Sequence, residues 1–220
     1  MRRLVLSLLL AGCSAENAAA RFLARPSAGA LSPNAVFIDS AGARRADESL
    51  GALSAPTGSV EAVQHFARTT LRDGSMLFAR TGDDGRVDSI LHFAAQGVTG
   101  DLPSTQLYQS AWNTRDVGAR LALLEQSWAE DGHYADPSVS VSGRAGLSDA
   151  IERYLRNAGT TSIDQNTPLQ VLPGGYFTFG WRISSAPPSD GFDVGRVEAG
   201  RITWLCGFFT ARAARQSEGL

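Results

Sequence analysis

The stretch Asp131–Pro137 carries the side chains of this chain that are best placed for chemistry. Asp136 precedes Pro137, and a residue before a proline favours an extended backbone over a helical one. Side chains of an extended segment alternate between two faces, so the Asp136 carboxyl can point into a cavity instead of water. We therefore take Asp136 as the first candidate site residue. A second base at His133 is an alternative that the sequence favours less than a histidine on the surface.

Two plainer interpretations stand beside this one. An aspartate in a turn more often accepts hydrogen bonds from backbone N–H groups than it takes part in catalysis. His133 follows Glu130 and Asp131, and acidic neighbours favour a position on the surface. The sequence leaves both alternatives open.

The composition excludes several function classes. The chain has 220 residues, 43% of them hydrophobic and 19% charged, which is typical of a folded soluble protein. A net charge of -2 gives no surface for nucleic acid. Every basic residue is arginine, which excludes Schiff-base chemistry on a lysine amine. The three histidines are far apart and show no metal-ligand spacing, so we expect no metal and no cofactor.

The N-terminus is typical of an export signal, with Arg2-Arg3 followed by a short apolar run. Leu10-Ala11-Gly12-Cys13 resembles the lipobox of bacterial lipoproteins. The resemblance implies a signal peptide over residues 1–12, a lipid on Cys13, and a place in the bacterial cell envelope, at the outer membrane or periplasmic face. A plain secretory signal and a secreted protein are the alternative. Residues 13–34 are rich in small residues and proline and predict a tether.

Residues 35–97 predict a small αβ segment with a thin core. The apolar spacing over residues 60–71 favours a helix, and two apolar runs around Asp83-Asp84-Gly85 favour a hairpin. The run from Gly85 to Phe93 echoes the run from Gly200 to Phe208. Either this is a degenerate internal repeat, or two hairpins share the same turn chemistry.

Residues 104–212 predict helices followed by strands, an α+β order. Three helical patterns come first: one around Tyr108, one that Asp116 caps and that runs to Gly132, and one after Gly146. Period-two patterns follow, above all over residues 176–183. We therefore expect four parts in the chain: the signal peptide, the tether, the small segment and this domain.

This domain resembles the nuclear transport factor 2-like superfamily, and within it the SnoaL-like group. The following pieces carry the resemblance: Tyr108 to Asp116, Leu123-Leu124, Trp128 to Asp131, Tyr134 to Pro137, Gly143-Arg144, and Gly200 to Ile202 before a strand with two phenylalanines. The resemblance implies a curved mixed or antiparallel sheet that forms a cone-shaped pocket closed by three helices. It covers about half of the chain.

The isomerases of this group imply a role for three residues. Asp136 matches their base, and Tyr108 and Asp193 match the two donors to an enolate oxygen. The chain departs from the pattern by four more residues between Asp116 and Asp136, which puts the aim of Tyr108 in doubt. Tyr108 can equally be a core tyrosine. Phe192 and Asp193 face opposite ways, so only one of them lies inside.

We expect an apolar pocket with this set of lining residues: Trp112, Trp128, His133, Phe179, Trp181, Trp204 and Phe208. The favoured function is an envelope-anchored module that binds a small apolar ligand without chemistry. The alternative is a proton-transfer enzyme, similar to ketosteroid isomerases or polyketide cyclases. A third option is a homodimer through the outer face of the sheet.

Overall fold

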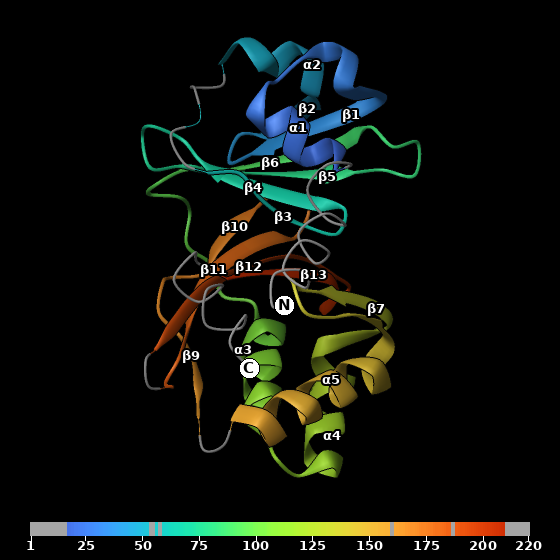
Figure 1. Cartoon of the computed structure of the whole chain (residues 1–220), viewed down its shortest axis with the longest axis vertical. Coiled ribbons are helices and arrows are strands. Elements are labelled where there is room, and N and C mark those ends of the chain that lie inside the picture. Colours follow the sequence, from blue (N-terminus) through green and yellow to red (C-terminus); the bar gives the residue numbers. More distant parts are fainter. Residues whose placement is uncertain (1–16, 53–55, 57–58, 159–160, 186–187, 210–220) are drawn as a thin grey trace, which may run out of the picture. The chain divides into compact units, whose positions relative to one another are not determined.

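The computed structural model describes residues 17–52, 56, 59–158, 161–185 and 188–209, and Figure 1 shows the order of its elements. The chain divides into two compact units, Met1–Gly97 (unit 1) and Val98–Leu220 (unit 2), each with its own sheet and core. The signal peptide predicted for residues 1–12 and the lipid predicted on Cys13 lie outside the described residues.

Unit 1 is a six-stranded sheet with two short helices. Its sheet has the order β2-β1-β6-β5-β4-β3, in which β1 and β6 are parallel and all other neighbours antiparallel. Its elements are α1 Ala18–Ala24, β1 Leu31–Asp39, β2 Gly42–Arg45, α2 Ala46–Ser49, β3 Glu61–Val63, β4 Phe66–Thr70, β5 Met76–Thr81 and β6 Val87–Phe93, with 3-10 turns at Ala28–Ala30 and Leu50–Ala52.

The predicted tether is wrong from Asn17 onwards, because this segment is folded into unit 1. The Asn17 side chain caps α1 by accepting from the Ala20 N–H at 3.1 Å, and it donates to the Gln64 carbonyl at 2.6 Å. Phe22 and Leu23 of α1 are buried in the core of unit 1. The alanines that suggested a flexible linker are also strong helix formers, and two large apolar side chains suffice to dock the helix.

The helix predicted over residues 60–71 is wrong as well, since this segment forms the hairpin of β3 and β4. Gln64 has φ 52, a left-handed conformation that ends any helix and suits a tight turn. Val63 and Phe66 face each other across the turn. Their β-branched and aromatic side chains favour strands, and the apolar spacing fits both periods in so short a segment. The predicted hairpin of β5 and β6 is confirmed.

Unit 2 has three helices and a mixed sheet, which confirms the α+β class. The sheet has the order β10-β11-β12-β13-β7-β8, with β9 paired to β11; β7 and β13 are parallel and the other pairs antiparallel. The elements are α3 Pro103–Trp112, α4 Val117–Ser127, β7 Trp128–Ala135, β8 Ser140–Ser142, α5 Gly143–Ala158, β9 Ile163–Gln165, β10 Gln170–Leu172, β11 Tyr176–Ile183, β12 Ser189–Glu198 and β13 Arg201–Phe209.

The second helix of unit 2 begins where predicted but ends early. Asp116 caps α4 by accepting from the Ala119 N–H at 2.8 Å. The helix stops at Ser127, and β7 continues at once with Trp128, so the tryptophan predicted on a helix face lies on a strand. The position of Trp128 fits both the helical and the strand spacing of apolar residues. It lies on a strand because it pairs with Ile202 of β13. All of β7 thus leads directly into Asp136.

A buried arginine joins the helices of unit 2. Arg120 on α4 is fully buried and pairs with Glu152 of α5 at 2.7 Å. Its Nε donates to the Ser148 hydroxyl at 3.0 Å and its Nη1 to the Thr114 carbonyl at 2.8 Å. A buried guanidinium is tolerated only when its N–H groups are used in this way. The arginine therefore fixes α4 and α5 on one side of the sheet.

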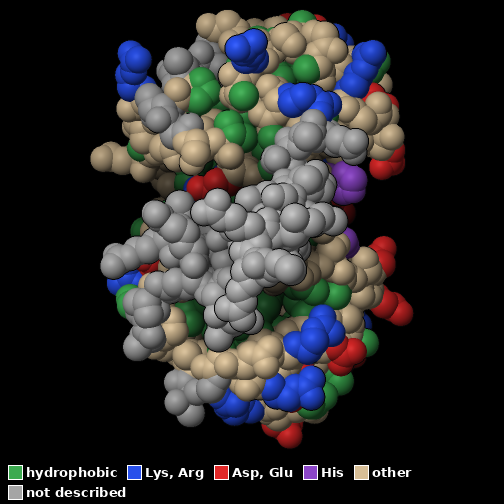
Figure 2. Space-filling model, viewed as in Figure 1, with side chains coloured by type: hydrophobic (Ala, Val, Ile, Leu, Met, Phe, Trp, Pro, Cys, Tyr) green, Lys and Arg blue, Asp and Glu red, His purple; other side chains and the backbone are tan. Residues whose placement is uncertain are grey.

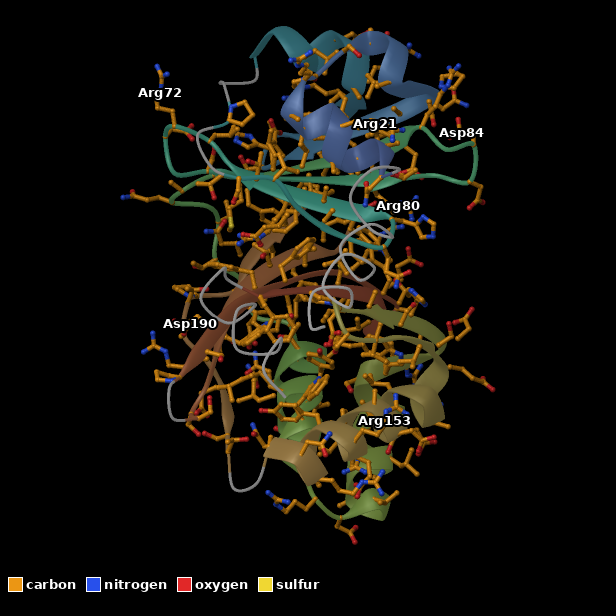
Figure 3. All side chains as sticks on the ribbon, viewed as in Figure 1. Arg21, Arg72, Arg80, Asp84, Arg153 and Asp190 are labelled. Atoms are coloured by element: carbon orange, nitrogen blue, oxygen red, sulfur yellow. The ribbon has the colours of Figure 1, made fainter. Side chains whose placement is uncertain are left out.

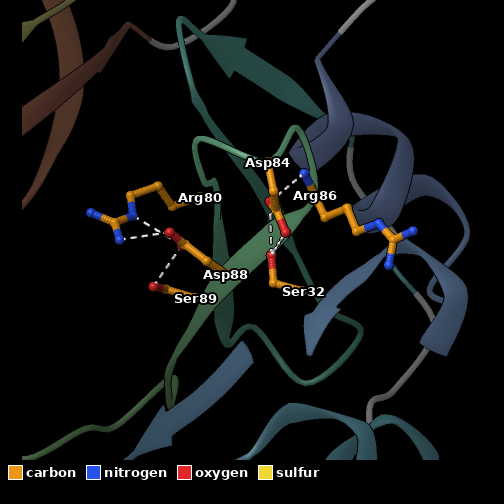
Figure 4. A network of polar contacts seen from close by, with 6 residues as sticks. All are labelled: Ser32, Arg80, Asp84, Arg86, Asp88 and Ser89. Atoms are coloured by element: carbon orange, nitrogen blue, oxygen red, sulfur yellow. Dashed lines mark hydrogen bonds and ion pairs between the residues drawn. The ribbon is translucent and has the colours of Figure 1, made fainter. Parts of the chain in front are cut away.

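The other charged side chains are mostly on the surfaces of the units. Acidic and basic groups are scattered over the face in Figure 2 without a patch of one sign. Of the residues labelled in Figure 3, Arg72, Asp84 and Arg153 are exposed. In unit 1 the hairpin of β5 and β6 carries an Arg80–Asp88 ion pair at 2.7 Å, and Ser32 of β1 donates to Asp84 at 2.7 Å (Figure 4).

Candidate site in the interior of unit 2

A buried carboxyl on β12 accepts two hydrogen bonds from aromatic side chains. Asp193 is 5% exposed, and its Oδ1 accepts from the Trp181 indole N–H at 2.8 Å. Its Oδ2 accepts from the Tyr108 hydroxyl of α3 at 3.4 Å, a long hydrogen bond. Phe192, the neighbour on the strand, is directed to the other face. The helix and the sheet thus bring Tyr108 and Asp193 together.

A second buried carboxyl follows β7. Asp136 is 6% exposed, and its Oδ2 accepts from the Tyr134 hydroxyl at 2.8 Å. Its Oδ1 accepts from the backbone N–H groups of Ser138 at 2.6 Å and Val139 at 2.9 Å, and from the Ser138 hydroxyl at 2.6 Å. The carboxyl organises a turn, as the plainer interpretation predicts, and it is also buried inside unit 2.

Gly207 on β13 lets the two carboxyls approach each other. It lies opposite Asp193 in the sheet. A Cβ atom on Gly207 would lie 3.2 Å from Asp193 Oδ1, 3.5 Å from the Asp136 Cβ and 3.5 Å from the Tyr134 hydroxyl. Because Gly207 has no side chain, the Asp193 and Asp136 carboxyls and the Tyr134 hydroxyl can all lie close to the backbone of β13.

The interior alters the acidity of these groups. The pKa of Asp193 is raised to about 7, chiefly by burial; the hydrogen bond from Trp181 opposes the rise, the Asp136 charge adds to it, and the hydrogen bond from Tyr108 opposes it. Burial, followed by the charge of Asp193, raises the pKa of Tyr108 well above 10. Burial and the Asp136 charge do the same to the pKa of Tyr134. Near neutral pH, Asp193 can therefore hold or release a proton, while both phenols stay neutral donors.

The carboxyls lie among aromatic rings. Tyr108 stacks on Trp128 with 5.7 Å between ring centroids, and Trp112 packs against Tyr134 at 5.6 Å. The indole N–H groups of Trp112 and Trp128 are buried, and neither has a hydrogen-bond partner in the described part of the chain. A buried donor without an acceptor costs about 1–3 kcal/mol, so both groups would gain from an acceptor atom.

The residues predicted to line a pocket divide between the two faces of the sheet. Trp112, Trp128, Phe179 and Trp181 belong to the core that holds Tyr108. His133, Trp204 and Phe208 lie on the opposite face from Asp193. The registers decide this, since Phe208 pairs with Phe192 and His133 pairs with Trp204, one position away from the inward set.

His133 has its own partners on that outer face. Its Nδ1 lies 3.1 Å from the Ser142 hydroxyl and its Nε2 lies 3.4 Å from the Ser140 hydroxyl, both on β8. A second base beside Asp136 is therefore wrong for His133. The list was wrong because it grouped residues by type, while strand alternation separates neighbours such as His133 and Tyr134.

The buried cluster described above consists of Tyr108, Tyr134, Asp136, Trp181, Asp193 and Gly207. Two of them, Tyr134 and Gly207, were not among the predicted site residues. Tyr134 was part of the pattern that carried the resemblance, and its position two residues before Asp136 places both side chains on one face of a strand. That spacing could have identified it. Gly207 gives no comparable signal, because a glycine in a strand becomes meaningful only when its neighbours across the sheet are known.

The described residues also bear on two other features, a metal site and a membrane-spanning helix. Among the described residues, no group of three or more His, Cys, Asp or Glu side chains could hold a metal ion. In the same part of the chain, no helix is long and apolar enough to cross a membrane. Cys206, next to Gly207, is buried with its thiol unpaired by any disulfide. Burial raises the pKa of that thiol well above 9, so it stays a neutral apolar side chain.

No protein-family model and no curated protein matches the chain. Similar solved structures include a candidate isomerase of the SnoaL-like family from Agrobacterium tumefaciens, at 29% identity over 50% of this chain and 97% of that one, with a TM-score of 0.47. A candidate ketosteroid isomerase from Kribbella flavida matches at 19% identity over 49% and 76%, with a TM-score of 0.40.

A third structure is an epoxide hydrolase from M. tuberculosis, at 12% identity over 52% of this chain and 86% of that one, with a TM-score of 0.40. The neighbours are SnoaL-like and ketosteroid-isomerase-like folds, the group that residues 104–212 resemble in sequence. Each of these matches covers about half of the chain.

Proposed function

We propose that unit 2 binds a small, mostly apolar molecule that presents one oxygen acceptor to Tyr108 and Asp193. The observation that carries this proposal is the meeting of the Tyr108 hydroxyl, the Asp193 carboxyl and the Trp181 indole in one apolar interior. Such polar groups, few and convergent among aromatic rings, are typical of a small-molecule site. The buried indole N–H of Trp112, in the same apolar core as Tyr108, adds a donor to this interior.

Native mass spectrometry of the untagged full chain, purified from its own host, tests this function. We expect a bound small molecule that is released on denaturation. Asp193→Leu should remove it, because the polar end of the ligand would face a methyl group. Asp190→Asn on the same strand, in an ion pair with Arg182, is the matched control and should retain it. Equal occupancy in the wild type and Asp193→Leu would contradict the proposal.

The pH dependence identifies the polar end of the ligand. An oxygen acceptor binds best to neutral Asp193, so its affinity should fall as pH rises through about 7. An ammonium ligand would show the opposite sign, because it prefers the carboxylate. Titrations with 2-naphthol and with tetramethylammonium between pH 5.5 and 8.5 separate the two cases, and tighter binding of the cation at high pH would overturn the acceptor assignment.

Proton transfer is a second candidate, favoured by the pKa of about 7 at Asp193 beside Asp136. Asp136 would take a proton from the carbon next to a ligand carbonyl, and the enolate oxygen would accept hydrogen bonds from Tyr108 and neutral Asp193. The protonated Asp136 carboxyl would then return the proton to a carbon of the enolate and become a carboxylate again, so that the step is balanced without a cofactor.

Deuterium exchange at the α-carbon of a cyclic ketone, followed by NMR, measures that step. Asp136→Asn should abolish exchange and retain ligand binding, because the amide oxygen still accepts from the turn but is not a base. Asp149→Asn, at an exposed position of α5, is the control. Unchanged exchange in the Asp136→Asn protein would eliminate the enzyme.

We propose further that a lipid on Cys13 anchors the chain in a bacterial envelope. The lipobox-like run Leu10-Ala11-Gly12-Cys13 supports this. Labelling with radioactive palmitate should mark the wild type and leave Cys13→Ser unlabelled. Label in both proteins, or in neither, would contradict the anchor.

A further inference from the structure

We infer that the two units are copies of one fold and that only the second copy has a ligand site; the site itself rests on the function proposed above. In both units the first strand pairs with the second in antiparallel and with the last in parallel. The remaining strands run antiparallel in the same order outward from the last. In both, a helix follows the second strand directly, 4 residues long in α2 and 16 residues long in α5.

The registers give the correspondence residue by residue. Ile90 lies five positions after Gly85, as Leu205 lies five positions after Gly200, within the two runs that echo each other. Across the parallel pair, Ile90 faces Phe37 and Leu205 faces Tyr134. Phe37 therefore takes the place of Tyr134, and Asp39, two residues later, takes the place of Asp136.

The turn after the first strand agrees with this alignment. Asp39 Oδ1 accepts from the N–H of Ala41 at 2.9 Å, and Asp136 Oδ1 accepts from the N–H of Ser138 at 2.6 Å. Each aspartate thus binds the backbone two residues further on. Two similar β-hairpins would share turn chemistry between β5 and β6 only; they would not share this turn.

The remaining positions of the cluster differ in unit 1. Two residues after Ile90, His92 faces Leu77, just as Gly207 faces Asp193. Leu77 belongs to the apolar core of unit 1. The His92 ring takes the place that Gly207 leaves free, with its centroid 6.0 Å from that of Phe37.

An arginine completes the replacement in unit 1. Arg44 faces Phe37 across the first pair, where unit 2 has Val141 facing Tyr134. The Arg44 guanidinium lies 4.6 Å from the centre of the Phe37 ring and 2.7 Å from the Asp39 carboxylate. In unit 1 the described side chains themselves occupy the neighbourhood of the Asp39 carboxyl, so the position equivalent to the unit 2 site is filled.

The first experiment counts sites and tests Gly207. Isothermal titration with 2-naphthol should give one molecule per full chain. Gly207→Ala should weaken binding at least tenfold, because its Cβ would lie 3.2 Å from Asp193 Oδ1 and would push this oxygen away by a few tenths of an ångström. The 13C signal of the Asp193 carboxyl should titrate at a changed pH in the same protein. Cys206→Ala, one position away and on the other face, is the control and should alter neither. Two sites per chain, or an unchanged Gly207→Ala, would overturn the inference.

The second experiment needs no ligand and separates this inference from the proposed function. Leu77→Asp with His92→Gly recreates the pattern of unit 2 inside unit 1. The new carboxyl should titrate at least two pH units above an ordinary aspartate, and Ser40→Asp, at an exposed turn, should titrate normally. A normal titration of Asp at position 77 would refute the correspondence. If that protein does not fold, Asp193→Leu with Gly207→His decides instead, since it should fold as unit 1 does; an unfolded unit 2 counts against the inference.

Discussion

Unit 1 and unit 2 treat a carboxylate at the end of the first strand in opposite ways. In unit 1, the hydrogen bond from Arg44 lowers the pKa of Asp39, and the pair remains partly open to water. In unit 2, Asp136 and Asp193 share an interior in which neither forms an ion pair with a described residue. The same strand order can therefore produce a self-contained ion pair or an anionic interior that lacks a counter-ion.

The two units differ in how much folding free energy they lose by burying a carboxyl group. A buried carboxyl with a raised pKa destabilises the fold wherever water would ionise it. Unit 1 avoids that cost with an arginine and a leucine. Unit 2 retains this loss of stability at Asp193. Buried ionisable groups that reduce stability without a structural benefit are common in functional sites. The following predictions test this contrast, from the largest effect to the smallest.

Arg120→Ala should have the largest effect, a loss of about 3–5 kcal/mol in the unfolding free energy of unit 2. Glu152 and the Thr114 carbonyl would keep no partner for the charge and the acceptor that Arg120 now satisfies. Hydrogen exchange of amides in each unit measures the loss. Arg153→Ala, exposed on the neighbouring helix, should change little. Equal losses in the two proteins would remove the structural role of Arg120.

Asp193→Leu should remove a pH-dependent loss of stability in unit 2 of about 2–4 kcal/mol between pH 4 and 7. At every pH it also leaves the Trp181 and Tyr108 donors without their acceptor, which opposes this gain. The folded pKa of Asp193, about 7, lies above its ordinary value of 3.8, so the unfolded chain releases the proton first. The wild type should thus lose stability as pH rises from about 4 to 7, and the variant should lose this slope.

Denaturant titrations of both proteins at pH 4, 5, 6 and 7 measure that slope. Asp190→Asn is the control on the same strand and should keep the wild-type slope. A wild-type stability that is flat over this range would show that Asp193 is ionised at no cost, and the contrast between the units would fail.

Arg44→Val should leave Asp39 of unit 1 without its ion-pair partner, as Asp136 and Asp193 are in unit 2. Asp39 would lose the hydrogen bond that lowers its pKa, and stability should fall by about 1 kcal/mol at neutral pH, a small figure because Arg44 is 40% exposed. The effect should vanish below the pKa of Asp39, where the pair is already broken. Arg72→Val, exposed elsewhere in unit 1, is the control. An equal effect of both changes would speak against the ion pair.

Removal of the helix cap in unit 2 should have the smallest effect, and comparison with the cap in unit 1 should still separate the units. Asp116→Ala removes one hydrogen bond to the Ala119 N–H and should cost about 1 kcal/mol. Asn17→Ala also removes the donation to the Gln64 carbonyl, so its cost should be larger, about 2 kcal/mol. Thermal melts of the two proteins compare these costs. A larger loss for Asp116→Ala would reverse the expected order.

The sequence predicted unit 2 better than unit 1 for physical reasons. Strands such as residues 176–183 alternate cleanly because one face is core, and a cap such as Asp116 acts within one turn of helix. Unit 1 has short elements, and a segment of ten residues around Gln64 fits two periods equally well. In such a case, tertiary pairing decides, and pairing is not visible in a local pattern.

The sequence predicted those residues of the candidate site that a short sequence pattern or the family resemblance identifies. Asp136 could be identified from its place before a proline, and Tyr108 and Asp193 came from the family resemblance. Gly207 and the outward position of His133, Trp204 and Phe208 follow from registers across the sheet. Those registers depend on a bulge in β7 between Trp128 and His133, which no rule of alternation foresees.

The parallel pairing of β7 with β13 has a consequence for synthesis. The strand that leads into Asp136 finds its partner only when the last described strand has left the ribosome, since Tyr134 pairs with Leu205. Until then, β7 has only the short hairpin to β8 beside it, and its backbone faces water or a chaperone. A chain that stops before β13 would lack the parallel neighbour of β7 and the Gly207 backbone beside both carboxyls, so these carboxyls can be enclosed only after this strand has been made.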